Sequence, residues 1–331
     1  FLKFILKGKK GNTSAFGTTI TLYKSDSIFF QEQMPVRGFE STVDSRPNFG
    51  LGKIDTIDSV RVEWPDGNVT NLKNVRTNQI LTLDANDGIV QKRSSINSSR
   101  QFFTDVSDRL KVEWTHKENE FVDFDRDRLT FHMLSSEGPK ICVGDVNGDG
   151  LDDFYVGGAK DQEGSLMIQS QDGKFKSTDK EVFFQDKQSE DTDCTFFDAD
   201  KDGDLDLYVC SGGNEFSPNS SSLSDRLYVN DGKGGFSKSN QLFPVVSTFE
   251  SSSTVKAEDY DNDGDVDLFV GVRLLPFYYG MPVSGYLLNN NGKGKFTNVT
   301  KDIAPGLTKI GMITDASWSD VDGDKDLDLI V

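Results

Sequence analysis

Four nine-residue windows of the sequence carry oxygen-bearing side chains at alternate positions. In every window Asp or Asn occupies positions 1, 3, 5 and 9, and three of the four windows have Gly at position 6. Ca²⁺ takes six to eight oxygen ligands at about 2.3–2.6 Å, and alternate residues of a tight loop can converge on such an ion. Gly allows the sharp backbone turn, and the carbonyl at position 7 can add a further oxygen. The pattern therefore predicts about one Ca²⁺ per window, up to four in the chain.

The predicted ligands fall into four sets, one for each window. They are Asp145, Asn147, Asp149, Leu151 and Asp153 in the first window; Asp198, Asp200, Asp202, Asp204 and Asp206 in the second; Asp259, Asp261, Asp263, Asp265 and Asp267 in the third; and Asp320, Asp322, Asp324, Asp326 and Asp328 in the fourth. Lys325 replaces Gly at position 6 of the fourth window. We therefore expect this window to bind Ca²⁺ less tightly.

Other uses of the same pattern are less favoured. An EF-hand loop begins in the same way but needs a bidentate Glu at position 12, where all four windows have Val. No Cys or His lies in the windows, which excludes zinc and copper there, and Mg²⁺ demands stricter octahedral geometry. An acidic Asp-Gly turn without metal is the remaining alternative. Four windows in phase argue against it, because packed carboxylates repel one another unless a cation offsets them.

The windows belong to a longer repeat, and they start at Asp145, Asp198, Asp259 and Asp320. Each window lies between a short alternating segment and an apolar one. The first three units add a third apolar segment (residues 166–168, 227–229 and 286–288), followed by a Gly-rich turn and a Phe. About four short strands per unit predict the four-stranded blades of a β-propeller. No unit shows the 3.6-residue periodicity of a helical solenoid.

The first unit departs from this pattern. The segment from Phe103 to the window at Asp145 is nearly twice as long as the corresponding segments before Asp198 and Asp259, so we place an insertion within 110–139. Residues 103–106 and 296–299 resemble each other and are predicted to be equivalent closing strands.

Residues 1–92 form a separate compositional unit. The alternating segments 18–23, 59–64 and 79–83 predict half-buried strands, and Trp64-Pro-Asp-Gly67 predicts a hairpin turn. A Ser-rich linker is expected at 93–101, followed by the propeller repeats at 102–331. The fold class is thus all-β: a small β domain followed by part of a calcium-binding propeller, with about four repeats present. The chain has no initiator Met and stops within an apolar run, so we expect a piece of a longer protein.

The net charge is concentrated in the windows. The chain has a formal charge of −18, and the windows hold 19 Asp and two Lys, leaving the rest of the chain with only −1. This balance argues against nucleic acid as a partner, because a nucleic-acid binder needs a basic surface, and against a basic face for membranes. No apolar run approaches the ~20 residues of a membrane span.

The three cysteines do not indicate a compartment. Cys142, Cys194 and Cys210 are odd in number and lie among strand-like apolar residues. We expect buried free thiols; one disulfide with a leftover thiol is the alternative.

Two parts of the chain resemble known families. The windows, the apolar strand after each, and the segment Leu-Tyr-Val-Asn-Asp-Gly-Lys-Gly-Gly-Phe (227–236) resemble the FG-GAP/VCBS repeats of integrin-α-type propellers. Segments 39–42, 48–52, 60–67 and 74–79 are similar to the ASPIC/UnbV domain. The pairing resembles cartilage-acidic-protein-like and bacterial surface VCBS-repeat proteins. The resemblance implies Ca²⁺ in a hairpin loop on one face of the propeller, which usually has seven blades.

Two functional hypotheses follow. The first is a Ca²⁺-stabilised propeller that is secreted, at the cell surface or in the cell envelope, and binds an extracellular protein or glycan, because weak Ca²⁺ loops suit a Ca²⁺-rich medium. The alternative is a Ca²⁺-dependent polysaccharide lyase or hydrolase. The only histidines, His116 and His132, lie in the insertion near Glu118 and Glu120 and could serve as acid/base groups, although a polar surface loop explains them as well. Asp123–Asp127 begins like a metal loop but lacks the Gly, and we do not predict a site there.

Overall fold

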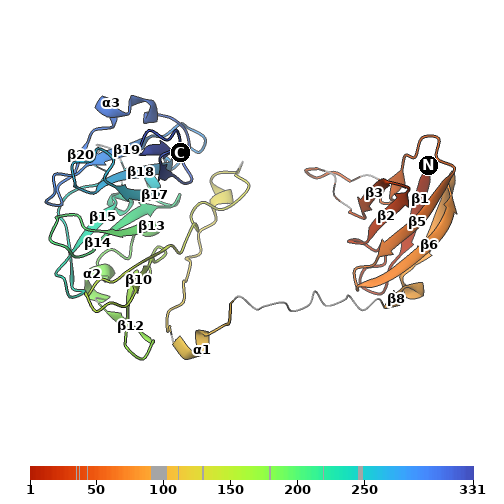
Figure 1. Cartoon of the computed structure of the whole chain (residues 1–331), viewed down its shortest axis with the longest axis horizontal. Helices are drawn as coiled ribbons and strands as arrows, with labels where there is room; N and C mark the ends of the chain where they lie inside the picture. Colours follow the sequence, from red (N-terminus) through yellow and green to blue (C-terminus); the bar gives the residue numbers. More distant parts are fainter. Residues whose placement is uncertain are drawn as a thin grey trace. The chain divides into compact units, whose positions relative to one another are not determined.

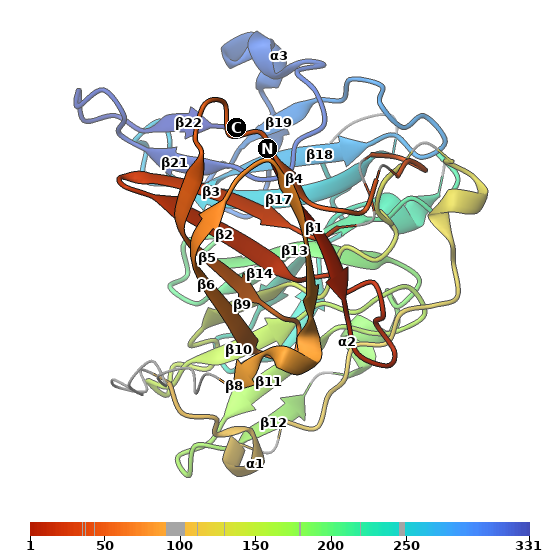
Figure 2. The same cartoon turned by 90° about the vertical axis from the view of Figure 1, so that its right-hand side faces the viewer.

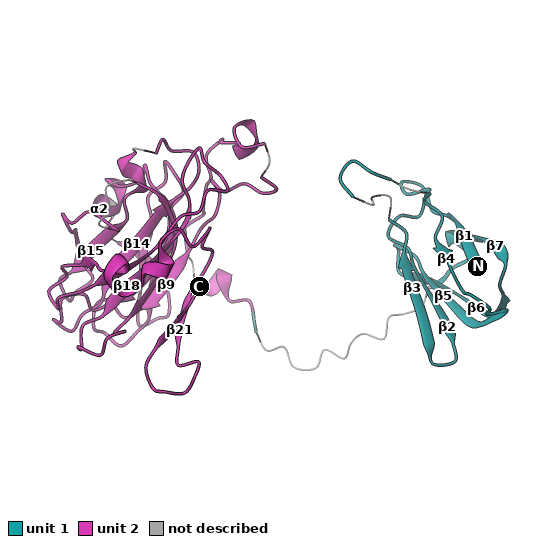
Figure 3. Ribbon diagram, turned by 90° about the horizontal axis from the view of Figure 1, so that it is seen from above, with its two compact units in different colours: residues 1–104 teal, residues 105–331 magenta. Residues whose placement is uncertain are grey.

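The computed structural model describes residues 1–331 except 35, 37, 43, 91–102, 111, 129, 179, 219 and 245–248. The chain divides into two compact units, residues 1–104 and 105–331 (Figure 3). The expected linker at 93–101 lies outside the described residues, so the domain boundaries at 92 and 102 stay predictions. No helix among the described residues is long and apolar enough to cross a membrane.

The first unit consists of two sheets. Its elements are β1 (Leu2–Lys7), β2 (Thr19–Lys24), β3 (Ser27–Glu32), β4 (Asn48–Phe49), β5 (Thr56–Glu63), β6 (Asn68–Arg76), β7 (Gln79–Asp84), the 3₁₀ turn η1 (Ala85–Asp87) and β8 (Ile89–Val90). The order β3-β2-β5-β6-β8 forms one sheet, with β2, β5 and β6 side by side (Figure 2), and β4-β1-β7 forms the other. Apolar residues at alternate positions of β1, β2 and β5, such as Phe4, Leu22 and Val60, bury one shared core.

The sequence predictions for this unit are confirmed where they concern strands. The segments 18–23, 59–64 and 79–83 lie largely in β2, β5 and β7. The predicted turn is present as well: the Gly67 amide donates to the Trp64 carbonyl at 2.8 Å, and Gly67 has a φ of 83°, which favours glycine.

The second unit consists of antiparallel sheets that follow one another along the chain (Figure 1). The first three have four strands each: β9 (Ile141–Gly144), β10 (Asp153–Val156), β11 (Ser165–Gln169) and β12 (Phe175–Thr178); β13 (Glu190–Phe197), β14 (Asp206–Gly212), β15 (Arg226–Asn230) and β16 (Phe236–Lys238); β17 (Ser251–Glu258), β18 (Asp267–Leu274), β19 (Gly285–Asn289) and β20 (Thr297–Asn298). The last sheet pairs β21 (Ser317–Ser319) with β22 (Asp328–Ile330). The predicted all-β fold with four-stranded propeller blades is confirmed.

The first strands of successive sheets lie next to one another. β13 contacts both β9 and β17, and β17 contacts β21. Hydroxyl groups of the first strands also form hydrogen bonds to the next repeat: Thr192 Oγ1 donates to the Ser252 carbonyl at 2.7 Å, and Ser253 Oγ donates to the Ile313 carbonyl at 2.8 Å. Both bonds join residues about one repeat apart, so the first strands form the inner wall of the propeller.

The core lies between neighbouring blades. Leu207 and Val209 of β14 pack in a cluster with β9 and β10, whereas Tyr208 of the same strand packs in a cluster with β17 and β18. Successive side chains of a strand point to opposite faces of its sheet, so one strand contributes to both clusters. The second and third sheets therefore bury both faces, whereas Ile141 and Val143 of the first sheet and Ile330 of the last are exposed. Cys142, Cys194 and Cys210 are buried and free in these clusters, as expected.

A buried polar junction also joins the first two blades. Asp191 of β13 accepts hydrogen bonds from Arg226 Nη2 at 2.5 Å, Tyr155 Oη at 2.8 Å and the Gly158 amide at 2.9 Å. Arg226 and Asp191 are both buried, and Tyr155 and Gly158 belong to the preceding blade. Because the buried charges are paired and hydrogen-bonded, they fix how the blades meet.

The insertion in the first propeller repeat, within residues 110–139 of the second unit, is mostly irregular where the structure describes it. The short helices of the second unit are α1 (Ser107–Leu110), η2 (Asp123–Asp125), α2 (Lys180–Phe184), η3 (Ser221–Leu223), α3 (Thr300–Ile303) and η4 (Pro305–Leu307). The predicted closing strand at residues 103–106 is wrong: these residues form no strand and lead into α1. Asp105 explains the difference, because its carboxylate accepts from the amide and hydroxyl of Ser107 and starts a turn. The equivalent prediction at 296–299 is confirmed in part by β20.

Candidate functional site

All four Asp-rich windows lie at the same place in their sheets. Each forms the loop between the first and second strands, as between β13 and β14, and its ninth residue is the first residue of the second strand. The loops therefore share one end of the blades. This end is opposite to the one where Glu190 of β13 pairs with Gly212 of β14.

The backbone of each loop wraps around the carboxylate at position 1. Asp198 accepts hydrogen bonds from the amides at positions 4 and 6, Lys201 and Gly203, at 2.8 and 3.1 Å. Asp145 and Asp320 accept from the same two positions of their loops, and Asp259 accepts from positions 5 and 6. Position 6 has a positive φ in every loop, including 80° at Lys325, where a side chain is strained. Position 4 is also left-handed, with Gly148, Lys201, Asn262 and Gly323, a feature that the sequence analysis missed.

Three loops gather carboxylates closely enough to share one ion. The groups, each with ligand atoms within 4.8 Å of one another, are Asp198, Asp200 and Asp206; Asp259, Asp261 and Asp263; and Asp320, Asp322 and Asp328. Positions 1 and 3 belong to every group, joined by position 9 in two loops and position 5 in one. In the first loop the amide oxygen of Asn147 takes the place of the position-3 carboxylate, and it accepts from the Asp149 amide.

The carboxylate at position 9 is buried in the first three loops, half-buried in the fourth, and anchors the loop. Asp206 accepts from the amide of Ala199 at 2.9 Å, within its own loop, and from that of Asn230 at 2.8 Å, on the third strand. Burial raises the pKa of Asp206 and of Asp267 to about 7, and the neighbouring aspartates add to the shift. Burial, with repulsion from Asp202 and Asp200, raises the pKa of Asp204 to about 6.

Several oxygens in these loops are buried without a partner among the described residues. They are Asp200 Oδ1, Asp204 Oδ1 and Asp267 Oδ2. A buried carboxylate oxygen without a donor costs free energy unless a cation or a proton offsets its charge. Unpartnered oxygens, converging carboxylates and the absence of nitrogen or sulfur ligands in the windows together fit a hard divalent cation. The ligand set predicted from the sequence stays a prediction.

The side chains at position 7 behave differently from those at positions 1 and 3. The carboxylate of Asp265 forms an ion pair with Lys201 of the preceding loop. The three-carboxylate groups leave out the position-7 residues Asp204, Asp265 and Asp326. They also leave out Asp202 and Asp324 at position 5 and Asp267 at position 9. For position 7, including Leu151, only the backbone carbonyl remains as the predicted ligand. Lys201 thus links two neighbouring loops.

Two asparagines, missed by the sequence analysis, link the loops further. Asn230 Nδ2 donates to the carbonyls of Val146 and Leu205 at 2.8 and 3.0 Å, and Asn290 Nδ2 donates to those of Ala199 and Val266 at the same distances. Each amide therefore joins the loop of its own blade to the loop of the preceding blade. Asn230 is the last residue of the third strand of its repeat, and Asn290 directly follows the third strand of the next repeat. Both precede a Gly-containing turn, a signal that was present in the sequence.

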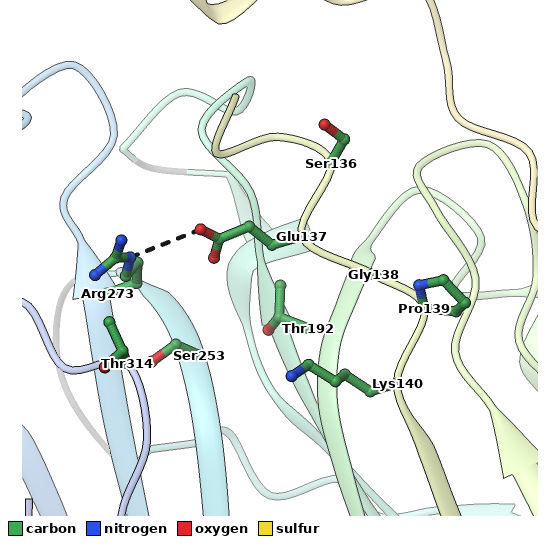
Figure 4. Close-up of a pocket in the computed structure, with 9 residues that line it drawn as sticks. All are labelled: Ser136, Glu137, Gly138, Pro139, Lys140, Thr192, Ser253, Arg273 and Thr314. Carbon is green, nitrogen blue, oxygen red and sulfur yellow. Dashed lines mark ion pairs between the residues drawn. The ribbon is translucent and has the colours of Figure 1, made fainter. Parts of the chain in front are cut away.

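A pocket of about 430 Å³ lies at the other end of the blades (Figure 4). Thr192, Ser253 and Thr314 line it from equivalent positions of three successive repeats. Arg273 of β18 faces Glu137 of the insertion, with 3.7 Å between Nε and Oε1. Hydroxyls, a guanidinium and a carboxylate can together bind a polar ligand, and the volume is in the range of small-molecule sites.

The sequence comparisons agree with this architecture. Residues 8–90 match the family described as ASPIC and UnbV, and residues 145–209 and 214–270 match the family described as FG-GAP-like repeat. These ranges include the first three Asp-rich windows and end before the fourth. No curated protein matches the chain.

The raised pKa values predict how the metal-free fold responds to pH. An Asp in an unfolded chain has a pKa of about 3.9, whereas Asp206 and Asp267 reach about 7 in the fold. The folded state therefore holds these protons more tightly, and its stability falls as the pH rises from about 4 through 7. We expect the melting temperature in EDTA to drop between about pH 5 and pH 8.

The variant Asp206→Asn, which cannot ionise, should flatten this dependence. Ca²⁺ should restore the melting temperature more at the higher pH, because it binds the carboxylate form. A melting temperature in EDTA that stays level or rises over the same interval would contradict the prediction.

Proposed function

We propose that this chain, which carries an ASPIC and UnbV domain followed by FG-GAP-like repeats, is a Ca²⁺-binding β-propeller protein that works outside the cell and binds a protein or a glycan. We place it among secreted, cell-surface or cell-envelope proteins. FG-GAP-like repeats suggest an integrin-like propeller, which is compatible with adhesion or binding. The net charge of −18 makes nucleic acid an unsuitable partner.

The observation that carries the proposal is the repetition of one carboxylate arrangement. Three groups of three aspartates occur at the same loop of three sheets, each with its ligand atoms within 4.8 Å. At such separations like charges repel by about 1 kcal/mol in water and by more near a protein surface. A single acidic turn could tolerate this repulsion, but its recurrence from blade to blade favours a resident cation. Oxygen-only ligands favour Ca²⁺.

Calcium in these loops has a structural role. The ion fixes the turn between the first and second strands of a blade, and Lys201, Asn230 and Asn290 connect that turn to the preceding or following loop. Each bound ion therefore supports the contact between two blades. Loops of modest affinity suit a medium with abundant Ca²⁺, which is the argument for an extracellular location.

The pocket opposite the loops supports a binding role. Its walls come from three blades and the insertion, so its shape depends on the blades being held together. We propose that it contacts the ligand through Arg273 and Glu137. The alternative from the sequence, a Ca²⁺-dependent polysaccharide lyase or hydrolase, stays a prediction, and turnover of a polysaccharide that is lost in His116→Ala would support it.

Calorimetric titration with Ca²⁺ tests the metal part. We expect the metal-free chain to bind up to four ions, and Asp261→Ala to bind one fewer, because Asp261 is at position 3 of the third loop. Asp172→Ala is the matched control, since this exposed aspartate pairs with Lys174 outside the windows. Lys325→Gly should strengthen the fourth site by removing a positive charge and the strained φ of 80°. No binding heat, together with an unchanged melting temperature in EDTA, would refute the metal part.

A glycan and matrix-protein array in Ca²⁺ buffer tests the ligand part. We expect Arg273→Ala to weaken binding to whichever ligand the wild type selects, because it removes one of the two cationic side chains that line the pocket, leaving Lys140. Arg128→Ala, an exposed arginine away from the pocket lining, should bind like the wild type. Equal binding by Arg273→Ala and the wild type would contradict the assignment of the pocket.

A further inference from the structure

A second cluster of metal-ligating side chains lies at the end of the blades opposite the Asp-rich loops. His116, Glu118 and Glu190 each offer one ligand atom, and these atoms lie within 4.8 Å of one another. His116 and Glu118 belong to the insertion, and Glu190 is the first residue of β13. Unlike the loops, this cluster combines an imidazole nitrogen with carboxylate oxygens.

Hydrogen bonds hold the insertion segment in place beside β13. The amide of Lys117 donates to Gln162 Oε1 at 2.8 Å, and Gln162 Nε2 donates to the Thr115 carbonyl at 2.8 Å. Asn119 Nδ2 donates to Glu215 Oε2 at 2.7 Å. The segment is thus fixed on both sides of His116 and Glu118, so the two side chains are positioned before any ligand arrives.

Two atoms of the cluster are buried without a hydrogen-bond partner among the described residues. They are Glu190 Oε1, on a residue only 1% exposed, and His116 Nδ1. The other Glu190 oxygen accepts from the Lys160 amide at 2.7 Å, and His116 Nε2 lies 2.7 Å from Glu118 Oε1. A Cβ at Gly138 would lie 3.5 Å from His116 Cε1 and 3.7 Å from Glu190 Oε1, so the ring and this oxygen border the same space.

The charges around this space are predominantly negative. The carboxylates of Glu118, Glu190 and Glu215 lie in one region, and Lys160 pairs with Glu215, with 3.4 Å between Nζ and Oε2. Burial, together with these carboxylates, raises the pKa of Glu190 to about 9. An ionised Glu190 is therefore costly unless a cation lies beside it.

We propose that His116, Glu118 and Glu190 form a binding site for a divalent transition-metal ion such as Zn²⁺. Imidazole and carboxylate together are ligands that Zn²⁺ accepts, whereas Ca²⁺ prefers oxygen alone. Three protein ligands leave a coordination position for water or for an oxygen of a bound molecule. Glu118 has the most exposed side chain of the three, at 33%, so we expect the ion to enter beside it.

The site would join the insertion to the second blade. Gly138 lines the pocket described above and also adjoins His116 and Glu190, so the ion would lie next to the proposed ligand site. The inference does not depend on calcium in the loops, because it rests on other residues at the other end of the blades. The competing arrangement is the contact between His116 and Glu118 without a metal ion, with Glu190 protonated.

Zinc titration of the full chain in saturating Ca²⁺ tests the proposal, because the Asp-rich loops are then occupied. We expect one equivalent of Zn²⁺ to bind, and His116→Ala and Glu190→Gln to weaken binding by at least about tenfold, or about 1.4 kcal/mol. His132→Ala is the matched control: His132 Nε2 lies 3.5 Å from Glu137 Oε1 in the same insertion, outside the cluster. This variant should bind Zn²⁺ like the wild type.

Cobalt provides a second readout. Co²⁺ at the site should give the visible absorption of a low-coordinate ion, and the band should disappear in Glu190→Gln. The glutamine side chain of this variant keeps an oxygen that can accept from the Lys160 amide, and circular dichroism verifies that the variant folds. If Glu190→Gln does not fold, Glu118→Gln, at the more exposed ligand, takes its place in the experiment. No zinc binding by the wild type, or equal weakening in His132→Ala, would overturn the proposal. A calcium titration without zinc tests the Asp-rich loops separately, so a chain that binds Ca²⁺ but not Zn²⁺ contradicts the zinc site alone.

Discussion

The structure of the second unit depends on the electrostatic cost of placing carboxylates together at every blade. The turn between the first two strands brings aspartates within 4.8 Å in three of the loops, and the ninth residue is buried where the second strand begins in the first three blades. The backbone alone cannot neutralise this charge: amides surround position 1, yet oxygens at Asp200, Asp204 and Asp267 lack partners among the described residues. On the proposed calcium binding, a divalent cation among the grouped carboxylates offsets this repulsion.

Ion pairs and hydrogen bonds connect each of these loops to the loop of a neighbouring blade. Lys201 pairs with a carboxylate of the following loop, and Asn230 and Asn290 each bond to the preceding one. Below the loops, β14 shares its side chains between two apolar clusters, and Thr192 and Ser253 connect the inner strands near the pocket. The end with the Asp-rich loops and the end with the pocket are therefore connected through the same first strands. Loosening a loop should change the walls of the pocket.

Local sequence patterns predicted the loops and most strands, because spacing within a nine-residue turn and alternation within a strand are local properties. Contacts between repeats could not be found in the same way. The bonds of Asn230 and Asn290, and the meeting of His116 with Glu190 from a distant part of the chain, depend on how blades pack. The closing strand expected at 103–106 was wrong because Asp105 starts a local turn that the resemblance to residues 296–299 did not reveal.

The central claim is that a cation occupies the Asp-rich loops and holds the blades together. Anomalous scattering from crystals grown in Ca²⁺ tests it most directly, because it locates the ion itself. The account predicts a peak among Asp198, Asp200 and Asp206, a second among Asp259, Asp261 and Asp263, and a weaker one in the loop containing Lys325. Well-ordered loops without a peak at any of these places, in crystals grown at high Ca²⁺, would contradict it.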